Sequence, residues 1–323
     1  MRLFVSILLL IMLGAARPQA APAPSETRLI MLGTGGGPVI RRNRSQPAAA
    51  LVVRGRVYLV DAGDDVARQL ALAGFRPSSP DVVFLTHLHL DHTAGLASLI
   101  AFAWTELRAS PIDIYGPPGA TALATADLRA FAISEDLFRQ ELVIGRPMAS
   151  IVRAHDIDVT APRLIYRDDL VKVWAVENSH YATLEPRQRG YGPARSYAYR
   201  FETPGRVVVF TGDTGPSPAV ERLAVGADVL VSEVIDLDKT LALVRERWRA
   251  PEAELKPVID HMAKEHLRPE DVGRLAARAG VKMVVLTHFA PGADEETDPS
   301  PYVDGVRREY SGPVVAARDL DEF

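Results

Sequence analysis

The sequence predicts a single domain with a layered α/β fold. Short runs of β-branched and apolar residues alternate along the chain with segments whose apolar residues recur at helical spacing. This alternation is typical of sheets that are covered by helices. Glycine, aspartate and histidine follow several of the apolar runs within a few positions, as expected where strands end at a sheet edge that carries a site. No linker or abrupt change of composition divides the chain.

The predicted strands are short runs that are rich in β-branched and aromatic residues. They are, in chain order, Arg28 to Leu32, Ala50 to Val53, Val57 to Val60, Val82 to Leu85, Ile112 to Tyr115, Val171 to Val176, Val207 to Phe210, Val229 to Val231 and Met283 to Leu286. The polar residues that follow several of these strands are the candidates for a functional site.

The predicted helices lie between the strands and have one apolar side. They are Asp65 to Ala73, Leu96 to Leu107, Ala120 to Phe131, Ser217 to Leu223 and Pro269 to Ala279. The last one begins with proline and is followed by Gly280, the residues that helices favour at their first turn and just after their end. Residues 181–196 and 290–301 are rich in glycine, proline and charge, and we expect them to be loops.

The first 21 residues are predicted to be a secretory signal peptide. Arg2 provides a positive start, Leu3 to Leu13 is almost entirely apolar, and small residues follow. The apolar run is too short for a stable membrane anchor, and cleavage is expected between Ala16 and Ala21. A mature domain over 22–323, periplasmic or secreted and free of the membrane, is therefore expected. The alternative is a short buried helix or a membrane tether.

Composition narrows the chemistry and the partners. The chain contains no cysteine, so a metal site has to use histidine, aspartate and glutamate. The net charge is −4 at pH 7, and removal of the basic start makes the mature chain more acidic. Because an acidic surface attracts polyanions poorly, no nucleic-acid partner is expected. The oligomeric state stays open, and a dimer is one possibility.

One heptapeptide carries most of the candidate metal chemistry. It runs from Thr86 to His92 with the sequence THLHLDH, directly after a predicted strand. In an extended segment His87 and His89 point to the same side, whereas Asp91 and His92 diverge and can serve two neighbouring metal ions. A polar loop without a metal is the alternative. It would need four ligand-type residues within six positions by coincidence, in a chain with eight histidines.

Three further residues of the same chemical kind follow later strands. His180 lies in the segment NSHY, Asp213 in TGDTG and His288 in LTH. Taken alone, each could be a structural residue at a strand end. Together with the heptapeptide they indicate a shared metal site at one edge of a sheet.

The whole set resembles the metallo-β-lactamase superfamily: His-x-His-x-Asp-His, a separate histidine, a Gly-Asp-Thr aspartate and a final Leu-Thr-His. The similarity extends from Met31-Leu32-Gly33-Thr34-Gly35 to His288. It implies a four-layer αββα sandwich with two zinc ions held between the sheets, and manganese or iron could replace the zinc. By motif position, the first ion is bound by His87, His89 and His180, the second by Asp91, His92 and His288, and Asp213 bridges both.

Within this superfamily the chain resembles the ribonuclease Z and arylsulfatase-like group. Gly33 to Pro38 with Arg42-Asn43 is similar to the opening of that group, and Leu59 to Gly63 is similar to its following strand and turn. His266 lies 22 positions before His288 (288 − 266), where the group carries an additional active-site histidine.

The spacing between two of the candidate ligands departs from the ribonuclease Z pattern. Short ribonuclease Z enzymes carry a tRNA-clamping arm between the third histidine and the Gly-Asp-Thr aspartate. Only 33 positions separate His180 from Asp213 here (213 − 180), which leaves little room for that arm. This spacing, the predicted export and the acidic balance favour the arylsulfatase-like members over tRNA processing.

The resemblance, together with the predicted signal peptide, therefore implies an exported binuclear zinc hydrolase of a small anionic ester, an aryl sulfate or a phosphodiester, that uses a hydroxide bridging the metals. Asp91 would orient the nucleophile and His266 would donate a proton to the leaving oxygen. Expected secondary or substrate contacts are Arg42, Tyr181, Glu233 and His261. Two alternatives stay open: lactone or β-lactam hydrolysis at the same site, and a metal-dependent binding module without catalysis.

Overall fold

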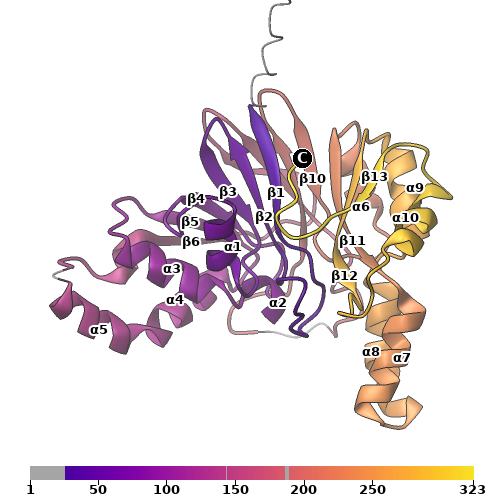
Figure 1. Ribbon diagram of the computed structural model, residues 1–323, viewed down its shortest axis with the longest axis horizontal. Coiled ribbons are helices and arrows are strands. Elements are labelled where there is room, and N and C mark those ends of the chain that lie inside the picture. The colour runs from indigo at the N-terminus through magenta and orange to yellow at the C-terminus, as the bar shows by residue number, and fades with distance from the viewer. Residues whose placement is uncertain (1–25, 143, 186–188) are drawn as a thin grey trace, which may run out of the picture.

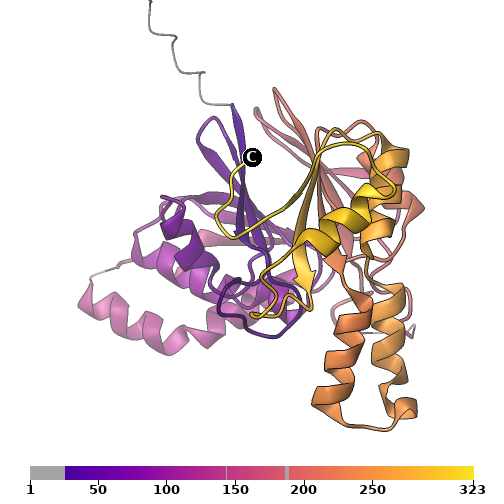
Figure 2. The ribbon, with the colours of Figure 1, turned by 45° about the vertical axis from the view of Figure 1, so that its right-hand side comes forward.

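The computed structural model describes residues 26–142, 144–185 and 189–323. The predicted signal peptide, residues 1–21, lies outside this part of the chain. Two sheets face each other and helices cover the outer face of each, which confirms the predicted four-layer αββα fold (Figures 1 and 2). No helix in the described ranges combines the length and the apolar character needed to span a membrane.

The first sheet has six strands in the order β1-β2-β3-β4-β5-β6. Their bounds are β1 (Thr27–Gly33), β2 (Ala48–Val53), β3 (Arg56–Val60), β4 (Pro80–Phe84), β5 (Ile112–Gly116) and β6 (Val152–Asp156). The first three strands are antiparallel and the rest are parallel, because helices form the connections from β3 onwards. The helices on its outer face are α1 (Val66–Leu72), α3 (Leu96–Thr105) and α4 (Ala120–Ala130).

The second sheet has seven strands in the order β13-β12-β11-β10-β9-β8-β7. Their bounds are β7 (Arg163–Arg167), β8 (Lys172–Glu177), β9 (Tyr197–Glu202), β10 (Val207–Phe210), β11 (Val229–Ile235), β12 (Val284–Ala290) and β13 (Val314–Ala316). Strands β7 to β10 are antiparallel, and β10 to β13 are parallel. The outer helices here are α6 (Pro218–Ala224), α9 (Pro269–Ala279) and α10 (Ser300–Arg307).

The inner strands of the first sheet are largely apolar on both faces because both faces are covered. In β4, Val83 packs toward the outer helices, whereas Val82 and Phe84 pack toward the other sheet. The Phe84 ring contacts Phe201 edge-on at 5.2 Å between ring centroids and Tyr199 at 5.8 Å. Side chains of a strand alternate between its faces, so a continuous apolar run marks a strand buried between two layers.

Every predicted strand and helix is present, with ends that differ by a few residues, but four strands and several helices were not predicted. The missed strands β6 and β7 lie at sheet edges and expose polar side chains, so they lack an apolar run. The missed helices include the short α2 (Leu90–Thr93), α5 (Ala132–Glu141) and the pair α7 (Leu237–Trp248) and α8 (Glu252–Lys264). The pair α7–α8 forms a hairpin that extends beyond the sandwich (Figures 1 and 2).

Candidate metal centre

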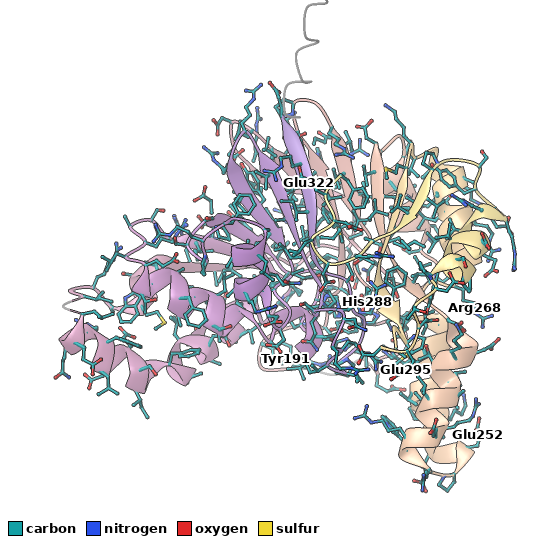
Figure 3. The ribbon with its side chains drawn as sticks, in the orientation of Figure 1. Tyr191, Glu252, Arg268, His288, Glu295 and Glu322 are labelled. Carbon is teal, nitrogen blue, oxygen red and sulfur yellow. The ribbon has the colours of Figure 1, made fainter. Side chains whose placement is uncertain are left out.

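The predicted metal ligands lie at one end of the sandwich, where strands of both sheets finish. Figure 3 marks this end by the labelled His288. The first sheet contributes the loop after β4 and the helix α2, and the second contributes the ends of β8, β10 and β12. The side chains are His87 and His89 from the loop, Asp91 and His92 from α2, His180 after β8, Asp213 after β10 and His288 in β12.

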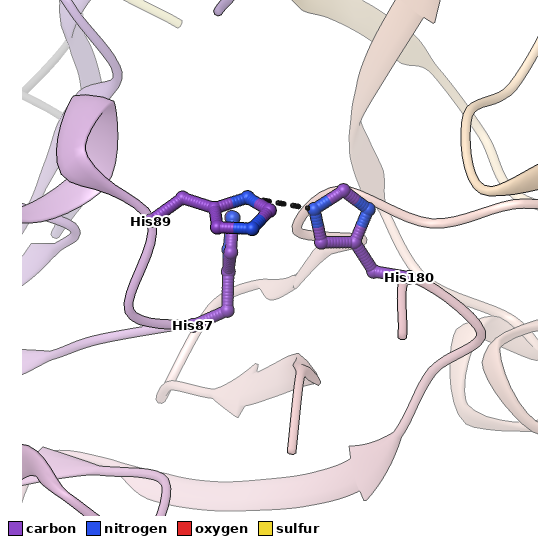
Figure 4. A group of neighbouring side chains, drawn as sticks. All are labelled: His87, His89 and His180. Carbon is purple, nitrogen blue, oxygen red and sulfur yellow. Dashed lines mark hydrogen bonds between the residues drawn. The ribbon is translucent and has the colours of Figure 1, made fainter. Parts of the chain in front are cut away.

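The first group of side chains consists of His87, His89 and His180. One ligand atom of each lies within 4.8 Å of the other two. Figure 4 shows His87 and His89 on one side and His180 opposite them, with His180 Nε2 at 3.1 Å from His89 Nδ1. Segments 91 positions apart in sequence therefore aim their imidazole nitrogens at one point.

The second group consists of Asp91, His92, Asp213 and His288, with ligand atoms again within 4.8 Å of one another. His288 Nε2 lies 3.0 Å from Asp213 Oδ2 and 3.4 Å from Asp91 Oδ2. His92 Nε2 lies 3.4 Å from Asp213 Oδ1. All four residues are buried, so these charges and nitrogens are shielded from water.

Asp213 connects the two groups. Its Oδ2 atom lies 3.9 Å from His87 Nε2 and 3.9 Å from His180 Nε2, in addition to its contacts with His288 and His92. The division into two groups, with one aspartate between them, is the arrangement that the family resemblance implied.

Several atoms of these groups have no partner of their own. His87 Nε2, His92 Nε2 and Asp213 Oδ1 are buried and make no hydrogen bond to any described residue. Buried polar atoms without a partner are costly and rare in folded proteins. Imidazole nitrogens and carboxylate oxygens are the donors that zinc, manganese and iron accept. The residues therefore fit divalent cations.

Hydrogen bonds on the far side of the rings orient them. Asp61 Oδ2 accepts a hydrogen bond from Nδ1 of His92 at 2.8 Å, and the hydroxyl of Thr86 lies 3.0 Å from Nδ1 of His87. Asp61 also accepts hydrogen bonds from the backbone N–H and the hydroxyl of Thr86. A ring whose Nδ1 is held in this way presents Nε2 to the centre, which is how metal-binding histidines are usually positioned.

His180 is oriented by Glu265, a residue that the sequence did not single out. Nδ1 of His180 donates to the backbone carbonyl of Glu265 at 3.1 Å. The Glu265 carboxylate accepts a hydrogen bond from Nδ1 of His261 and another from the backbone N–H of Thr183. Glu265 is fully buried, so one residue positions two histidines of the site.

The backbone is distorted at two residues of the centre. Asp61 has φ 62 and His288 has φ 45, both in the left-handed region that side chains other than glycine rarely adopt. The pairing of β11 with β12 shifts register between Glu233 and Val234, and His288 is the unpaired residue of that bulge. A Cβ atom on Gly36 would come within 2.7 Å of His288 Nδ1, so only glycine fits beside the ring.

Burial and charge prepare these groups for a cation. Burial lowers the pKa of His87 well below its usual value, and the neighbouring His92 and His180 lower it further, so the ring is neutral. Burial raises the pKa of Asp213, but the opposing effect of His288 and His92 is larger and leaves that pKa well below the ordinary value. Asp213 is therefore a carboxylate, and both residues offer free electron pairs.

The sequence matches the family described as a beta-lactamase superfamily domain over residues 56–289. These residues include all seven predicted ligands. The chain belongs to the metallo-β-lactamase superfamily.

Individual members of this superfamily are similar over most of their length. Ribonuclease Z of Mycobacterium marinum is 31% identical over 270 residues, which cover 81% of this chain and 86% of that protein. Ribonuclease Z of Mycobacterium bovis is 29% identical over 301 residues, which cover 90% of this chain and 96% of that protein. The superfamily hydrolase described here is thus ribonuclease Z-like in sequence.

Solved structures share the metallo-β-lactamase fold. Human tRNase Z, short form, aligns with a TM-score of 0.64 and 21% identity, covering 92% of this chain and 98% of that one. The metallo-β-lactamase fold protein YhfI of Bacillus subtilis aligns with a TM-score of 0.63 and 18% identity, over 92% and 98% of the two chains. These likenesses concern the fold.

The two additional histidines of this superfamily member lie beside the metal centre. Nδ1 of the buried His266 is hydrogen-bonded to Glu233 at 2.7 Å, and its ring centroid lies 5.0 Å from that of His180. Burial opposes charge on His266, but the carboxylate of Glu233 raises its pKa overall. His261, in α8, is partly exposed, and its ring centroid lies 5.2 Å from that of His180. Both line the pocket above the centre.

Of the predicted substrate contacts, Tyr181 lies at the site and Arg42 does not. The ring of Tyr181 packs at 5.2 Å from both His89 and His180, and burial raises the pKa of its hydroxyl. Arg42 does not reach the site. Its side chain is 77% exposed and pairs with Asp294 and Glu295, and among the described residues Arg41 lines the pocket in its place.

Proposed function

We propose that this superfamily hydrolase is a phosphodiesterase with a centre of two divalent cations, zinc first among them, and that it acts on a small anionic ester. The observation that carries the proposal is the shared Asp213 between two largely buried groups of nitrogen and oxygen donors. The choice of a phosphodiester is supported by the relatives of about the same length, which are named ribonuclease Z. A ribonuclease cleaves phosphodiester bonds.

In the proposed reaction a water oxygen forms a bond to phosphorus while the bond from phosphorus to the leaving oxygen breaks. Divalent cations at this centre would lower the pKa of a water molecule and stabilise charge on the phosphoryl oxygens. Asp91 lines the pocket and would orient the attacking water. Nδ1 of His266 is held by Glu233, which leaves Nε2 to hold a proton for the leaving oxygen.

A small substrate is favoured by the shape of the site. The pocket over the centre has a volume of about 930 Å³, within the usual range for small ligands. The connection between β8 and β9 lies where short ribonuclease Z enzymes carry their tRNA-clamping arm. Its described residues, 178–185 and 189–196, include no helix or strand. The net charge of −4 does not favour the binding of a polyanion such as RNA.

RNA is the second candidate substrate, against the expectation that no nucleic acid is bound. Its support is the name of the relatives, of which the first is 31% identical over 81% of this chain. Lactone or β-lactam hydrolysis and a non-catalytic binding role have no comparable support.

A substrate panel tests the proposal. The metal-loaded protein is assayed with bis(p-nitrophenyl) phosphate, p-nitrophenyl sulfate, an aryl lactone, a cephalosporin and a tRNA precursor with a 3′ extension. We expect the phosphodiester to be cleaved fastest. Preference for the tRNA precursor would support the RNA alternative, and preference for the sulfate, lactone or cephalosporin would contradict phosphodiesterase activity. Inactivity with all five would favour a binding module.

We also propose that residues 1–21 direct export, which the basic start and apolar run of this segment support. Sequencing of the amino terminus of the protein recovered from a periplasmic fraction tests this. A mature chain that results from cleavage between Ala16 and Ala21 is expected. An intact Met1 in the cytoplasmic fraction alone would contradict export.

A further inference from the structure

We propose that the hairpin α7–α8 is an apolar wall of the substrate site, and that the substrate is a phosphodiester carrying an apolar group such as a phenyl ring. The inference rests on the proposed phosphodiesterase function and adds the class of substrate. It follows from a cavity that the metal centre and the hairpin share.

One pocket of about 930 Å³ joins the metal centre to the hairpin. His89, Asp91, Asp213 and His288 line it on the side of the centre, with His266 beside them. The hairpin lines the facing side with Thr240, Leu243, Val244, Trp248, Val258 and Met262. A molecule bound at the centre and larger than its reacting group therefore meets the hairpin.

The residues of the hairpin that line the pocket form one stripe on each helix. On α7, Thr240, Leu243 and Val244 are spaced by three and four positions, which places them on the same side of the helix. On α8, Val258 and His261 have the same kind of spacing, and Met262 lies next to His261. The stripe of α8 thus runs from apolar residues to a histidine that contacts the centre.

The outer residues of the wall, Leu243 and Trp248, are not needed to hold the hairpin in place. The base of the hairpin packs in a cluster around Ile235, Leu237 and Ala290, and Met262 of the pocket lining packs against this cluster. Farther out, Leu243 is 41% exposed and Trp248 is 56% exposed. Large apolar side chains that stay exposed beside a catalytic pocket mark a surface that a ligand covers. Figure 3 labels Glu252 near the outer end of the hairpin, well beyond the sandwich.

Cationic side chains complete the pocket and suit an anion. Arg41, Arg247 and Arg249 line it; the acidic residues of the lining are Glu246 on the hairpin and the two aspartates of the metal centre, Asp91 and Asp213. Arg247 forms no ion pair with any residue in the described ranges, so its charge is available. An ester that is both anionic and apolar matches this combination of guanidinium groups, metal donors and exposed aliphatic side chains.

Two esters with the same leaving group isolate the contribution of the wall. They are p-nitrophenyl phenyl phosphate and p-nitrophenyl methyl phosphate, assayed as kcat/KM with the metal-loaded protein. The test variant is Leu243→Gln with Trp248→Gln, which keeps residues that helices accept. The control is Ile133→Gln on α5, because Ile133 is an exposed apolar residue, 81% accessible, outside the pocket.

We expect the unchanged protein and the control to prefer the phenyl ester by about tenfold or more, as burial of a ring in an apolar pocket implies. In the double variant the ratio of the two kcat/KM values should fall close to one. A ratio that the double variant leaves unchanged would overturn the inference.

A binding measurement separates this inference from the proposed activity. Diphenylphosphinate and dimethylphosphinate have no ester bond to cleave, so their dissociation constants report the wall alone. If the wall exists, diphenylphosphinate should bind about tenfold more tightly than dimethylphosphinate. The double variant should lose this difference in affinity. If that difference is found while neither ester is hydrolysed, the activity is wrong and the wall stands. Equal affinities, or a solution dimer that covers Trp248, would overturn the wall.

Discussion

The histidines of the centre are positioned by hydrogen bonds that reach far along the chain. Asp61 holds His92 from 31 positions away, and the carbonyl of Glu265 holds His180 from 85 positions away. The candidate ligands themselves were predictable, because they sit in short motifs after apolar strands. The roles of Asp61 and Glu265 were not, since they arise only when distant segments meet, although Asp61 follows its own strand in the same way as the ligands do.

Removal of Asp61 should weaken metal binding. In Asp61→Ala, the ring of His92 loses its partner at Nδ1 and Thr86 loses two hydrogen bonds. We expect the affinity for zinc to fall by about 10- to 100-fold, as for other residues that orient metal-bound histidines. Competition with a chelating dye measures this. Asp113→Ala is the matched control, because Asp113 pairs with His155 at 2.8 Å outside the candidate metal groups. Equal affinities in the two variants would contradict the role of Asp61.

His266 should matter for catalysis and not for metal content. It is bonded to Glu233 and lines the pocket beside the centre. In His266→Ala we expect kcat/KM for bis(p-nitrophenyl) phosphate to fall by about 10²- to 10⁴-fold, the usual range for loss of a proton donor. Elemental analysis should find the same amount of metal as in the unchanged protein. Loss of one ion per chain would instead make His266 a ligand, which its closeness to His288 permits.

At the scale of elements, strands and helices that are buried were easier to predict from the sequence than those that are partly exposed. Strands such as β4 and β12 are covered on both faces and contain buried apolar runs, Val82 to Phe84 and Val284 to Leu286, so these runs stand out in the sequence. The hairpin α7–α8 was missed because its apolar residues are separated by arginines and glutamates and because Pro257 lies inside α8. A helix that lines a cavity instead of a core carries a weak apolar pattern. The element that we propose to select the substrate was therefore the hardest to predict.

One carboxylate joins the two sheets at the turn between β7 and β8. Asp168 accepts hydrogen bonds from Tyr58 of β3 at 2.6 Å and from Tyr166 of β7 at 2.9 Å, and pairs with Arg56 at 2.9 Å. Burial acts to raise the pKa of Asp168, but these hydroxyls and two backbone N–H groups lower it overall. The ionised form is thus the one that stabilises the fold.

Asp168→Asn should lower the free energy of unfolding at neutral pH by about 1 to 3 kcal/mol. Because the folded pKa is depressed, the stabilisation is present above the unfolded value of about 3.9 and is lost as the pH falls through the folded value. The difference from the unchanged protein should therefore shrink in acid. Urea unfolding at several pH values measures it, with the exposed Asp169→Asn as control. A difference that grows toward low pH would refute the assigned role of Asp168.

At the scale of the whole molecule, the fold serves to bring two sheets together at one end. His87, His89, Asp91 and His92 come from the first sheet, and His180, Asp213 and His288 come from the second. Neither sheet alone supplies enough donors for two cations. The α/β fold class was predictable because strands and helices alternate along the sequence. The packing of two sheets against each other was expected from the family resemblance. The volume above the centre could not be predicted, since it depends on where the hairpin packs.

The central claim is that these seven side chains hold a pair of metal ions, and metal content tests it most directly. Elemental analysis of the purified protein should find about two divalent ions per chain, the number that the two donor groups imply. In His87→Ala one ion should be lost, and in Asp213→Ala, which removes the carboxylate shared by both groups, at least one. Metal content that stays undiminished in both variants would contradict the account.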